Sequence, residues 1–289
     1  MSLWACVYAE DVLHMALLKM TARNAAYQKF ETLQRNREKR THEKLFFVEG
    51  VHPIEQAVAA GWEFEAIGFA AGRRLSGWAM DMRAKAKAET EYEIAPELMA
   101  ELSNREEPCE LIALIRQRAD GLRRMAERAD ETALFVLFDR PQNPGNLGTV
   151  IRSADAFGAD GLIITGHGAD LYDPQCVRAT IGAIFHMPVA AMASAEEALQ
   201  WLDGLGVRPQ VVGTSAKGDG LISEIDMTGP TLLVIGNETF GMSKAWKAGC
   251  DKLAKIPIYG AASSLNVGCA ASICLYEIAR QRGFEPPEM

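Results

Sequence analysis

The segment IPIYGAASSLNVGCAASICLYE, Ile256–Glu277, decides how the C-terminal half of this chain folds. Its β-branched beginning is typical of a strand that ends at Gly260, and small or polar residues follow as far as Ser264. From Asn266 to about Arg280 the sequence is nearly free of charge and rich in Ala, Ser and Cys, which predicts a buried helix. Small, hydroxyl and amide residues therefore lie where a strand runs into a helix, and the rest of the sequence has to explain them.

Upstream of this segment, apolar runs of strand length alternate with helical patterns from residue 133 onward. The predicted strands are ALFVLFD, GLIITG, QVVGTSA, TLLVIGNE and KLAKIPIYG, and the helices between them include NLGTVIRSADAFGA and SAEEALQWLDGLG. Buried strands that alternate with helices are typical of a mainly parallel sheet covered on both faces. We therefore predict an α/β domain of this kind over residues 133–289.

The first half of the chain predicts a smaller unit. Residues 43–118 contain strand and helix patterns that predict a small α/β domain. Residues 119–132 are polar and carry charges of both signs, which favours an inter-domain linker. Residues 1–42 are expected to form an N-terminal extension that contains a basic helix over 21–42.

Composition excludes several classes of protein. The chain has 289 residues, of which 24 % are charged, and it contains no apolar run long enough to span a bilayer. The stretch Leu3–Leu18 carries Glu10 and Asp11 and lacks the basic start of a signal peptide. The six cysteines form no C-x-x-C pair and the five histidines do not cluster near them. We expect a cytoplasmic protein with reduced thiols and without a metal site.

The charge is unevenly distributed. The net charge of −8 argues against a uniformly basic coat for nucleic acid. Residues 19–44, however, contain eight Lys or Arg against three Glu. This basic segment is either a solvated helix face or a contact for RNA phosphates, and charge alone favours the solvated face.

Polar loops follow three of the predicted strands. They are RPQNPGNLGTVIR, NETFGMS and AASSLNVG, and open α/β sheets bind ligands beyond the carboxyl ends of their strands. Taken singly, each loop has a structural explanation, since Asn146 suits a helix N-cap and Glu238 suits the start of a helix. Capping does not explain Arg152, which lies inside a helix that otherwise has a buried pattern. The three loops together predict a binding site.

These segments resemble the three motifs of the SpoU (TrmH-type) branch of the SPOUT RNA methyltransferases. The matching stretches are NPGNLGTVIRSADAFG, LLVIGNETFGMS and Ile256–Glu277, joined by a similar connector, YDPQCVRATIGAIFHMPV. Gly268 and Thr180 stand where the family often has serine. The stretch KLFFVEGVHPIEQAVAAG resembles the ribosomal-protein-like RNA-binding domain that precedes some of these catalytic domains.

The resemblance implies a parallel sheet with a C-terminal trefoil knot, a topology that composition does not predict. It also offers an answer to the opening question, because Gly260 to Ser264 are small enough for backbones to cross at close range. The same crossing is expected to form the S-adenosylmethionine pocket. The implied reaction moves the methyl group of that cofactor to a ribose 2′-hydroxyl of structured RNA without a metal.

Carried residue by residue, the resemblance assigns two sets of side chains. The candidate catalytic residues are Arg152, Asn146, Glu238, Ser264 and Asn266. The candidate cofactor-binding residues are Thr214, Gly236, Asn237, Ile256, Ile258 and Leu265. A guanidinium is effectively always protonated, so we expect Arg152 to hold the phosphate beside the reacting ribose rather than to abstract a proton. The RNA phosphate or Glu238 then accepts the proton.

The resemblance further implies RNA as the partner, ribosomal RNA ahead of transfer RNA, and a homodimer in which Arg152 acts on the partner subunit's cofactor. Two alternatives remain open from the residues alone. One is a nicotinamide-dependent dehydrogenase, although Gly145 and Gly148 do not form G-x-G-x-x-G. The other is a non-enzymatic RNA-binding or ribosome-assembly protein.

Overall fold

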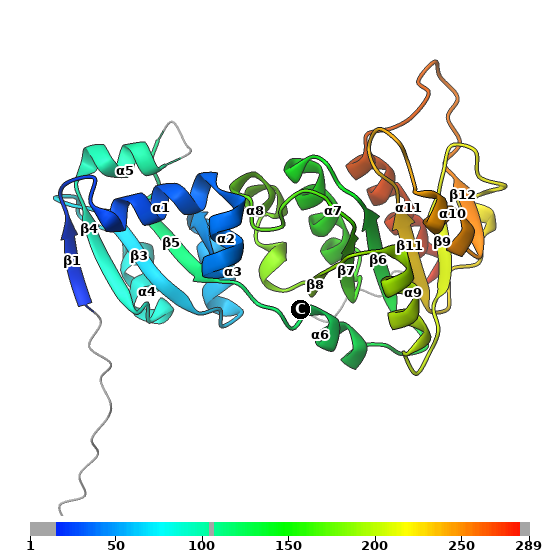
Figure 1. The fold of residues 1–289 in the computed structure, drawn as a ribbon, viewed down its shortest axis with the longest axis horizontal. Coiled ribbons are helices and arrows are strands. Elements are labelled where there is room, and N and C mark those ends of the chain that lie inside the picture. Colours follow the sequence, from blue (N-terminus) through cyan, green and yellow to red (C-terminus); the bar gives the residue numbers. More distant parts are fainter. Residues whose placement is uncertain (1–15, 104–106, 284–289) are drawn as a thin grey trace, which may run out of the picture.

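The computed structural model describes residues 16–103 and 107–283, which form two sheets that lie one after the other along the molecule (Figure 1). The first fifteen residues of the expected extension lie outside the described part. No helix within the described ranges is long and apolar enough to cross a membrane.

The N-terminal domain is built on a sheet of five strands in the order β1-β4-β3-β5-β2. Strands β1, β4 and β3 are parallel, and β5 runs antiparallel to both β3 and β2. The strands are β1 Ala16–Met20, β2 Leu45–Glu49, β3 Phe64–Ala70, β4 Thr90–Ile94 and β5 Leu111–Arg116. The helices are α1 Ala25–Arg35, α2 Arg37–Glu43, α3 Val51–Ala59, α4 Gly77–Ala86 and α5 Pro96–Leu102.

Residues 16–43 are part of this domain, whereas the sequence predicted a separate extension. Strand β1 pairs with β4, and Met20, Phe30 and Leu33 are buried in the same core as Leu45. The expected single helix over 21–42 is two helices, because Asn36 has an extended backbone (φ −119°, ψ 110°). Its side chain caps α2 by accepting a hydrogen bond from a backbone N–H of the first turn, so one residue ends α1 and starts α2.

The C-terminal domain contains seven strands in the order β10-β12-β9-β11-β6-β7-β8, and every pair is parallel. The strands are β6 Leu134–Asp139, β7 Gly161–Thr165, β8 Val189–Met192, β9 Gln210–Thr214, β10 Gly220–Leu221, β11 Thr231–Ile235 and β12 Lys252–Lys255. The helices are α6 Gly121–Glu127, α7 Pro144–Ala156, α8 Pro174–Thr180, α9 Ala195–Asp203, α10 Lys244–Gly249 and α11 Val267–Gln281, with 3-10 turns at Ala183–Phe185 and Ile222–Glu224. The prediction of a mainly parallel α/β fold is confirmed.

In strands β6, β7, β9 and β11, alternate residues are buried in one of two cores, one on each face of the sheet. Val136 and Phe138 of β6 pack with residues of α7 and α11 on one face, whereas Phe135 and Leu137 pack with residues of α9 and α10 on the other. Side chains of this size each contribute about 1.5–3 kcal/mol when they are fully buried. Helices therefore cover both faces of the sheet, and the carboxyl ends of its strands are left uncovered at one edge.

The expected linker, residues 119–132, is also packed rather than free. It contains α6, whose Met125 is completely buried under the sheet. The two domains share a continuous apolar core, in which Trp62 of the first domain donates a hydrogen bond of 2.9 Å from Nε1 to the carbonyl of Phe185. The rings of these two residues meet edge to face. The first domain is thus fixed against the second.

The segment between β12 and α11 differs from the expectation. Strand β12 ends at Lys255 instead of continuing to Gly260, and residues 257–266 are exposed in a loop that projects from the domain (Figure 1). A Cβ at Gly260 would meet nothing within 4 Å, so the predicted close crossing at this glycine is wrong. Close approaches between backbones occur elsewhere in this domain, for example at Gly236 and Gly218, where a Cβ would lie 2.4 and 2.6 Å from backbone atoms of Met242 and Ala254. The trefoil knot stays a prediction.

Candidate active site

The carboxylate of Glu238 joins the first and second polar loops. It accepts hydrogen bonds from the backbone N–H groups of Gln142 and Asn143, at 3.0 and 3.1 Å, and from the side-chain amide of Asn146 at 3.4 Å. Glu238 follows β11, and these three donors follow β6, its neighbour in the sheet. One carboxylate thus holds the loop that leads into α7.

Asn146 joins the first loop to the third. Its side-chain carbonyl accepts a hydrogen bond of 3.2 Å from the amide of Asn266. The Oδ1 atom of Asn266 in turn caps α11 by accepting from the backbone N–H groups of Gly268 and Cys269. Glu238, Asn146 and Asn266 therefore form one bridge across three segments that the sequence predicted to converge.

Hydrogen bonds of buried polar groups fix the conformation of the second loop, residues 237–243. Backbone hydrogen bonds close it between Asn237 and Gly241 in both directions. The amide nitrogen of Asn237 donates to the carbonyl of Arg140, and its Oδ1 accepts from two N–H groups of the loop. Arg140 pairs with Asp139, whose hydrogen bond raises the pKa of the guanidinium. The side chain of Asn237 is thus engaged by the loop itself.

A cleft of about 520 Å³ opens beside this bridge, where β9, β11 and β12 end. It is lined by all six candidate cofactor-binding residues, and also by the candidate catalytic residues Glu238 and Ser264. Its size lies within the usual range for small-molecule sites, roughly 300–1,000 Å³. The cleft therefore gathers residues that are more than fifty positions apart in the sequence.

The chemistry of the lining fits S-adenosylmethionine. Ile256, Ile258 and Leu265 supply apolar walls for an adenosine, and strand ends supply backbone N–H and C=O groups for the edge of its base. A Cβ at Gly236 would lie 2.4 Å from the backbone N of Met242, so only glycine fits at this position of the cleft lining. Lys217 and Lys247 also line the cleft and provide cations for a carboxylate.

Two of the candidate hydroxyl residues differ in what they contact. The hydroxyl of Thr214 donates a hydrogen bond of 3.0 Å to the carbonyl of Val234 and so ties β9 to β11. Ser264 lies on the exposed loop at the mouth of the cleft. Thr214 thus has a partner within the sheet, whereas Ser264 is placed where a ligand can reach it.

Arg152 lies on α7, away from the bridge. It is exposed, and among the residues that the structure describes no carboxylate comes within ion-pair distance of it. Helix α7 packs against α11 through a hydrogen bond of 2.8 Å between Ser153 and Ser272. Next to this contact, Ile273 and Tyr276 of α11 are 40 % and 51 % exposed, which is high for an apolar side chain. Within this chain, Arg152 is not among the residues that line the cleft.

Several residues of the site were missed by sequence reasoning. Phe240 lines the cleft and is 71 % exposed, and Lys217 lines it on the loop after β9. An aromatic residue in a polar, glycine-flanked loop was a signal for Phe240. The roles of Gln142 and Asn143 rest on their backbone N–H groups, which no residue-type argument detects.

Metal ligands do not gather in the described part of the chain, where no group of three or more His, Cys, Asp or Glu residues is positioned to hold an ion. Cys176 and Cys274 are buried, and burial raises the pKa of the Cys274 thiol to about 12. Cys269, at the start of α11, is exposed.

Both domains match known protein families. Residues 133–276 match the SpoU rRNA Methylase family, and residues 24–113 match the SpoU L30e-like domain. The chain is 44 % identical, over 92 % of its own length and 93 % of the relative's, to a 23S rRNA (uridine(2479)-2′-O)-methyltransferase of Streptomyces viridochromogenes.

Solved structures agree with this match. The SpoU methyltransferase AviRb from Streptomyces viridochromogenes, in complex with the cofactor AdoMet, has a TM-score of 0.84 at 44 % identity and covers 90 % of this chain and 98 % of its own. The AdoMet-bound rRNA methyltransferase from Sinorhizobium meliloti has a TM-score of 0.81 at 30 % identity and covers 91 % and 98 %. The likeness therefore extends over both domains and their arrangement.

Proposed function

This chain belongs to the SpoU rRNA methylase family, and we propose that it transfers a methyl group from S-adenosylmethionine to a ribose 2′-hydroxyl of 23S ribosomal RNA. Ribosomal RNA is favoured over transfer RNA because a relative that matches 92 % of the chain is named for a 23S rRNA uridine. The match of the first domain to the SpoU L30e-like domain supports the same substrate class. A ribosomal RNA substrate implies the cytoplasmic location that the composition suggests.

The observation that carries this proposal is the bridge of Glu238, Asn146 and Asn266 at the rim of the cleft. It connects a cofactor-sized cleft to the start of α7, the helix that bears Arg152. When bound, S-adenosylmethionine supplies a methyl group on a sulfonium. The task of the chain is therefore to align the hydroxyl and stabilise charge, and positioning of this kind supplies a large share of the rate of such transfers.

We propose that S-adenosylmethionine binds in the cleft. The apolar side chains of Ile256, Ile258 and Leu265 enclose the adenosine, and the backbone around Gly236 and Asn237 reads the edge of its base. Lys217 is assigned to the carboxylate of the methionine part. Thr214 and the side chain of Asn237 are assigned to keeping the strand ends in place, in line with their hydrogen bonds inside the protein.

We assign the RNA phosphate beside the reacting ribose to Arg152, whose planar fork suits two phosphate oxygens and whose charge has no partner among the described residues. We assign the orienting of the ribose hydroxyl to Ser264, which lines the cleft. Glu238 already accepts hydrogen bonds from two backbone amides and one side-chain amide. Because of this engagement we assign Glu238 to holding the loop, and the proton of the hydroxyl to the RNA phosphate.

We further propose that the chain works as a homodimer through α7 and α11, with Arg152 acting on cofactor that the partner subunit holds. The exposed Ile273 and Tyr276 support this arrangement, because they lie on α11, which packs against the helix of Arg152. Mixing two inactive variants tests it. Arg152→Ala and Gly236→Ala, refolded together, are expected to regain activity, since the mixed dimer has one site with both residues intact. No recovery on mixing would assign both residues to the same subunit's site.

The reaction itself is tested with tritiated S-adenosylmethionine and 23S rRNA from a strain that lacks this protein. Wild-type chain is expected to incorporate label at one ribose, located by ribose-methylation mapping, and Arg152→Ala is expected to lose about 100-fold or more in kcat. Transfer RNA from the same strain serves as the comparison substrate. Label in transfer RNA alone would refute the ribosomal assignment, and label in neither would refute the activity.

A further inference from the structure

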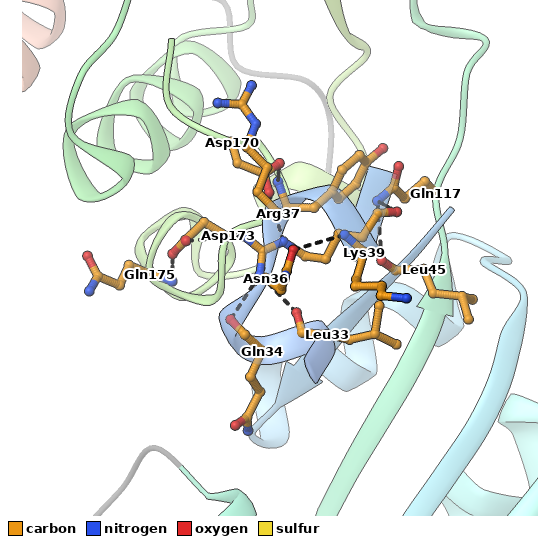
Figure 2. A network of polar contacts seen from close by, with 12 residues as sticks. Leu33, Gln34, Asn36, Arg37, Lys39, Leu45, Gln117, Asp170, Asp173 and Gln175 are labelled. Atoms are coloured by element: carbon orange, nitrogen blue, oxygen red, sulfur yellow. Dashed lines mark hydrogen bonds and ion pairs between the residues drawn. The ribbon is translucent and has the colours of Figure 1, made fainter. Parts of the chain in front are cut away.

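Arg40 of α2 lies buried between the two domains, with 2 % of its surface exposed. Figure 2 labels residues of the polar network around it, among them Leu33, Gln34, Asp170 and Asp173. Its guanidinium donates to Asp170 at 2.7 Å and contacts Asp173 at 3.4 Å, both in the C-terminal domain. It also donates to the carbonyls of Leu33 and Gln34, each at 2.9 Å. Among the basic residues of segment 19–44, Arg40 therefore fits neither of the two alternatives, because it is neither on a solvated face nor accessible to RNA phosphates.

The segment that Arg40 holds, Gly166–Asp173, touches the loop of the active site at one end. Arg37 of α2 donates a hydrogen bond of 2.6 Å to the carbonyl of Gly168. Gly168 packs so tightly on Pro141 that a Cβ there would lie 2.8 Å from the proline ring, and the next N–H of the segment donates to the Pro141 carbonyl. Pro141 directly precedes the two N–H groups that donate to Glu238.

The same segment reaches α7 at its other end. Asp173 contacts Arg40 with one carboxylate oxygen, and with the other it caps α8 by accepting from the N–H of Gln175 at 2.9 Å. Helix α8 packs against α7 at Gly148, where a Cβ would lie 2.4 Å from a carbonyl of α8. Helix α7 carries Asn146 and Arg152. Through the Gly166–Asp173 segment, α2 of the first domain therefore supports the loop after β6 at Pro141 and, by way of α8, the helix α7 that follows this loop.

We propose that Arg40 is a positioning residue for methyl transfer: it fixes the Gly166–Asp173 segment, and through it the loop after β6 and helix α8. The N-terminal domain is then part of the catalytic scaffold as well as a platform for RNA. This inference rests on the proposed function for its kinetic consequence. Its structural consequence, the order of the loop, is independent of any activity.

Lys39 gives a matched control, because it is the neighbouring cation on α2, is exposed and has no ion pair within the described ranges. The experiment compares Arg40→Met with Lys39→Met in the full chain. It measures kcat and KM with 23S rRNA, the Kd for S-adenosylmethionine by calorimetry, and amide hydrogen exchange of residues 141–147. We expect Arg40→Met to lower kcat about tenfold or more, to leave the KM for RNA within about twofold, and to speed exchange in 141–147.

Lys39→Met is expected to change only the KM for RNA and to leave exchange as in wild type. Arg40→Lys keeps the charge but loses the planar fork, so its kcat should fall between the other two. If Arg40→Met does not fold, the triple variant Arg40→Met, Asp170→Asn, Asp173→Asn removes all three charges and keeps an asparagine cap on α8. Its kcat should be as low as that of Arg40→Met.

The proposal is overturned if Arg40→Met and the triple variant keep the wild-type kcat and the wild-type hydrogen exchange of residues 141–147. It is also overturned if they change only the KM for RNA, and by as much as Lys39→Met does. If wild-type chain labels no RNA, the proposed function fails, while the exchange comparison still decides whether Arg40 orders the loop.

Discussion

Removal of the Glu238 carboxylate tests the central bridge most directly. The variant Glu238→Ala takes away the acceptor for three donors: two backbone N–H groups of the loop after β6, and the amide of Asn146. Arg140, at the beginning of the same loop, also donates to the carbonyl of Gly241 at 3.1 Å, but the acceptor for Gln142, Asn143 and Asn146 is Glu238. The loop is therefore expected to loosen while the strands beneath it stay intact, because their cores lie elsewhere.

The size of the effect follows from the number and kind of these bonds. A hydrogen bond to a charged group contributes about 1.5–3 kcal/mol when it is buried, and less where water replaces it. Glu238 is only partly buried, so we assign about 1 kcal/mol to each donor and about 3 kcal/mol to the three together. If the transition state needs the ordered loop, this corresponds to roughly 100-fold in kcat. Glu238→Gln keeps one acceptor oxygen and should lose roughly tenfold.

The assay is single-turnover methyl transfer with saturating cofactor, accompanied by thermal unfolding. Glu197→Ala is a suitable control, since this exposed carboxylate also accepts from a backbone N–H, at 2.7 Å from that of Ala193, but lies on α9. The control should retain wild-type kcat. The reasoning is refuted if Glu238→Ala transfers methyl within about threefold of wild type while binding cofactor normally.

Three further outcomes follow from the described contacts. Lys217→Gln should weaken the binding of S-adenosylmethionine by about 1 kcal/mol in calorimetry, but it should leave the binding of methylthioadenosine, which has no carboxylate, unchanged. Equal weakening of both ligands would show that Lys217 does not bind the carboxylate. Gly148→Ala should lower the melting temperature, because the new Cβ meets the backbone of α8. In a helix without such a contact, Gly→Ala normally stabilises by about 1 kcal/mol. Gly77→Ala, which has open space around it, should therefore be neutral or stabilising. Iodoacetamide at pH 8 should modify the exposed Cys269 and spare Cys274, whose burial raises its pKa to about 12, until the chain unfolds; mass spectrometry of both peptides decides this.

The C-terminal domain could be predicted from sequence because each of its elements carries a local signal. Strands such as 134–139 are continuous apolar runs, and buried parallel strands have that composition. The polar loops were recognisable because they interrupt this pattern at strand ends. Their convergence then follows from the parallel sheet, which puts all carboxyl ends on one edge.

The features that were missed depend on contacts between distant parts of the chain. Strand β1 is a short edge strand with four exposed residues, so its sequence has no buried pattern, and only its pairing with β4 makes it a strand. Arg40 has the same type and surroundings in sequence as exposed cations nearby, and its two acidic partners are 130 and 133 positions away. The exposed loop after β12 has small residues that favour close packing, but it packs against nothing at Gly260.

The three residues of the bridge, Asn146, Glu238 and Asn266, leave the ribosome one after another during synthesis. Asn146 emerges first, Glu238 second and Asn266 third, and the third residue is followed directly by α11, which packs on α7. A nascent chain that stops before Ile256 lacks the apolar residues Ile256, Ile258 and Leu265 of the cleft and the whole of α11. An enzyme that modifies ribosomal RNA would in this way stay inert beside the particle that is making it, and become competent only after the third segment has been synthesised and docked.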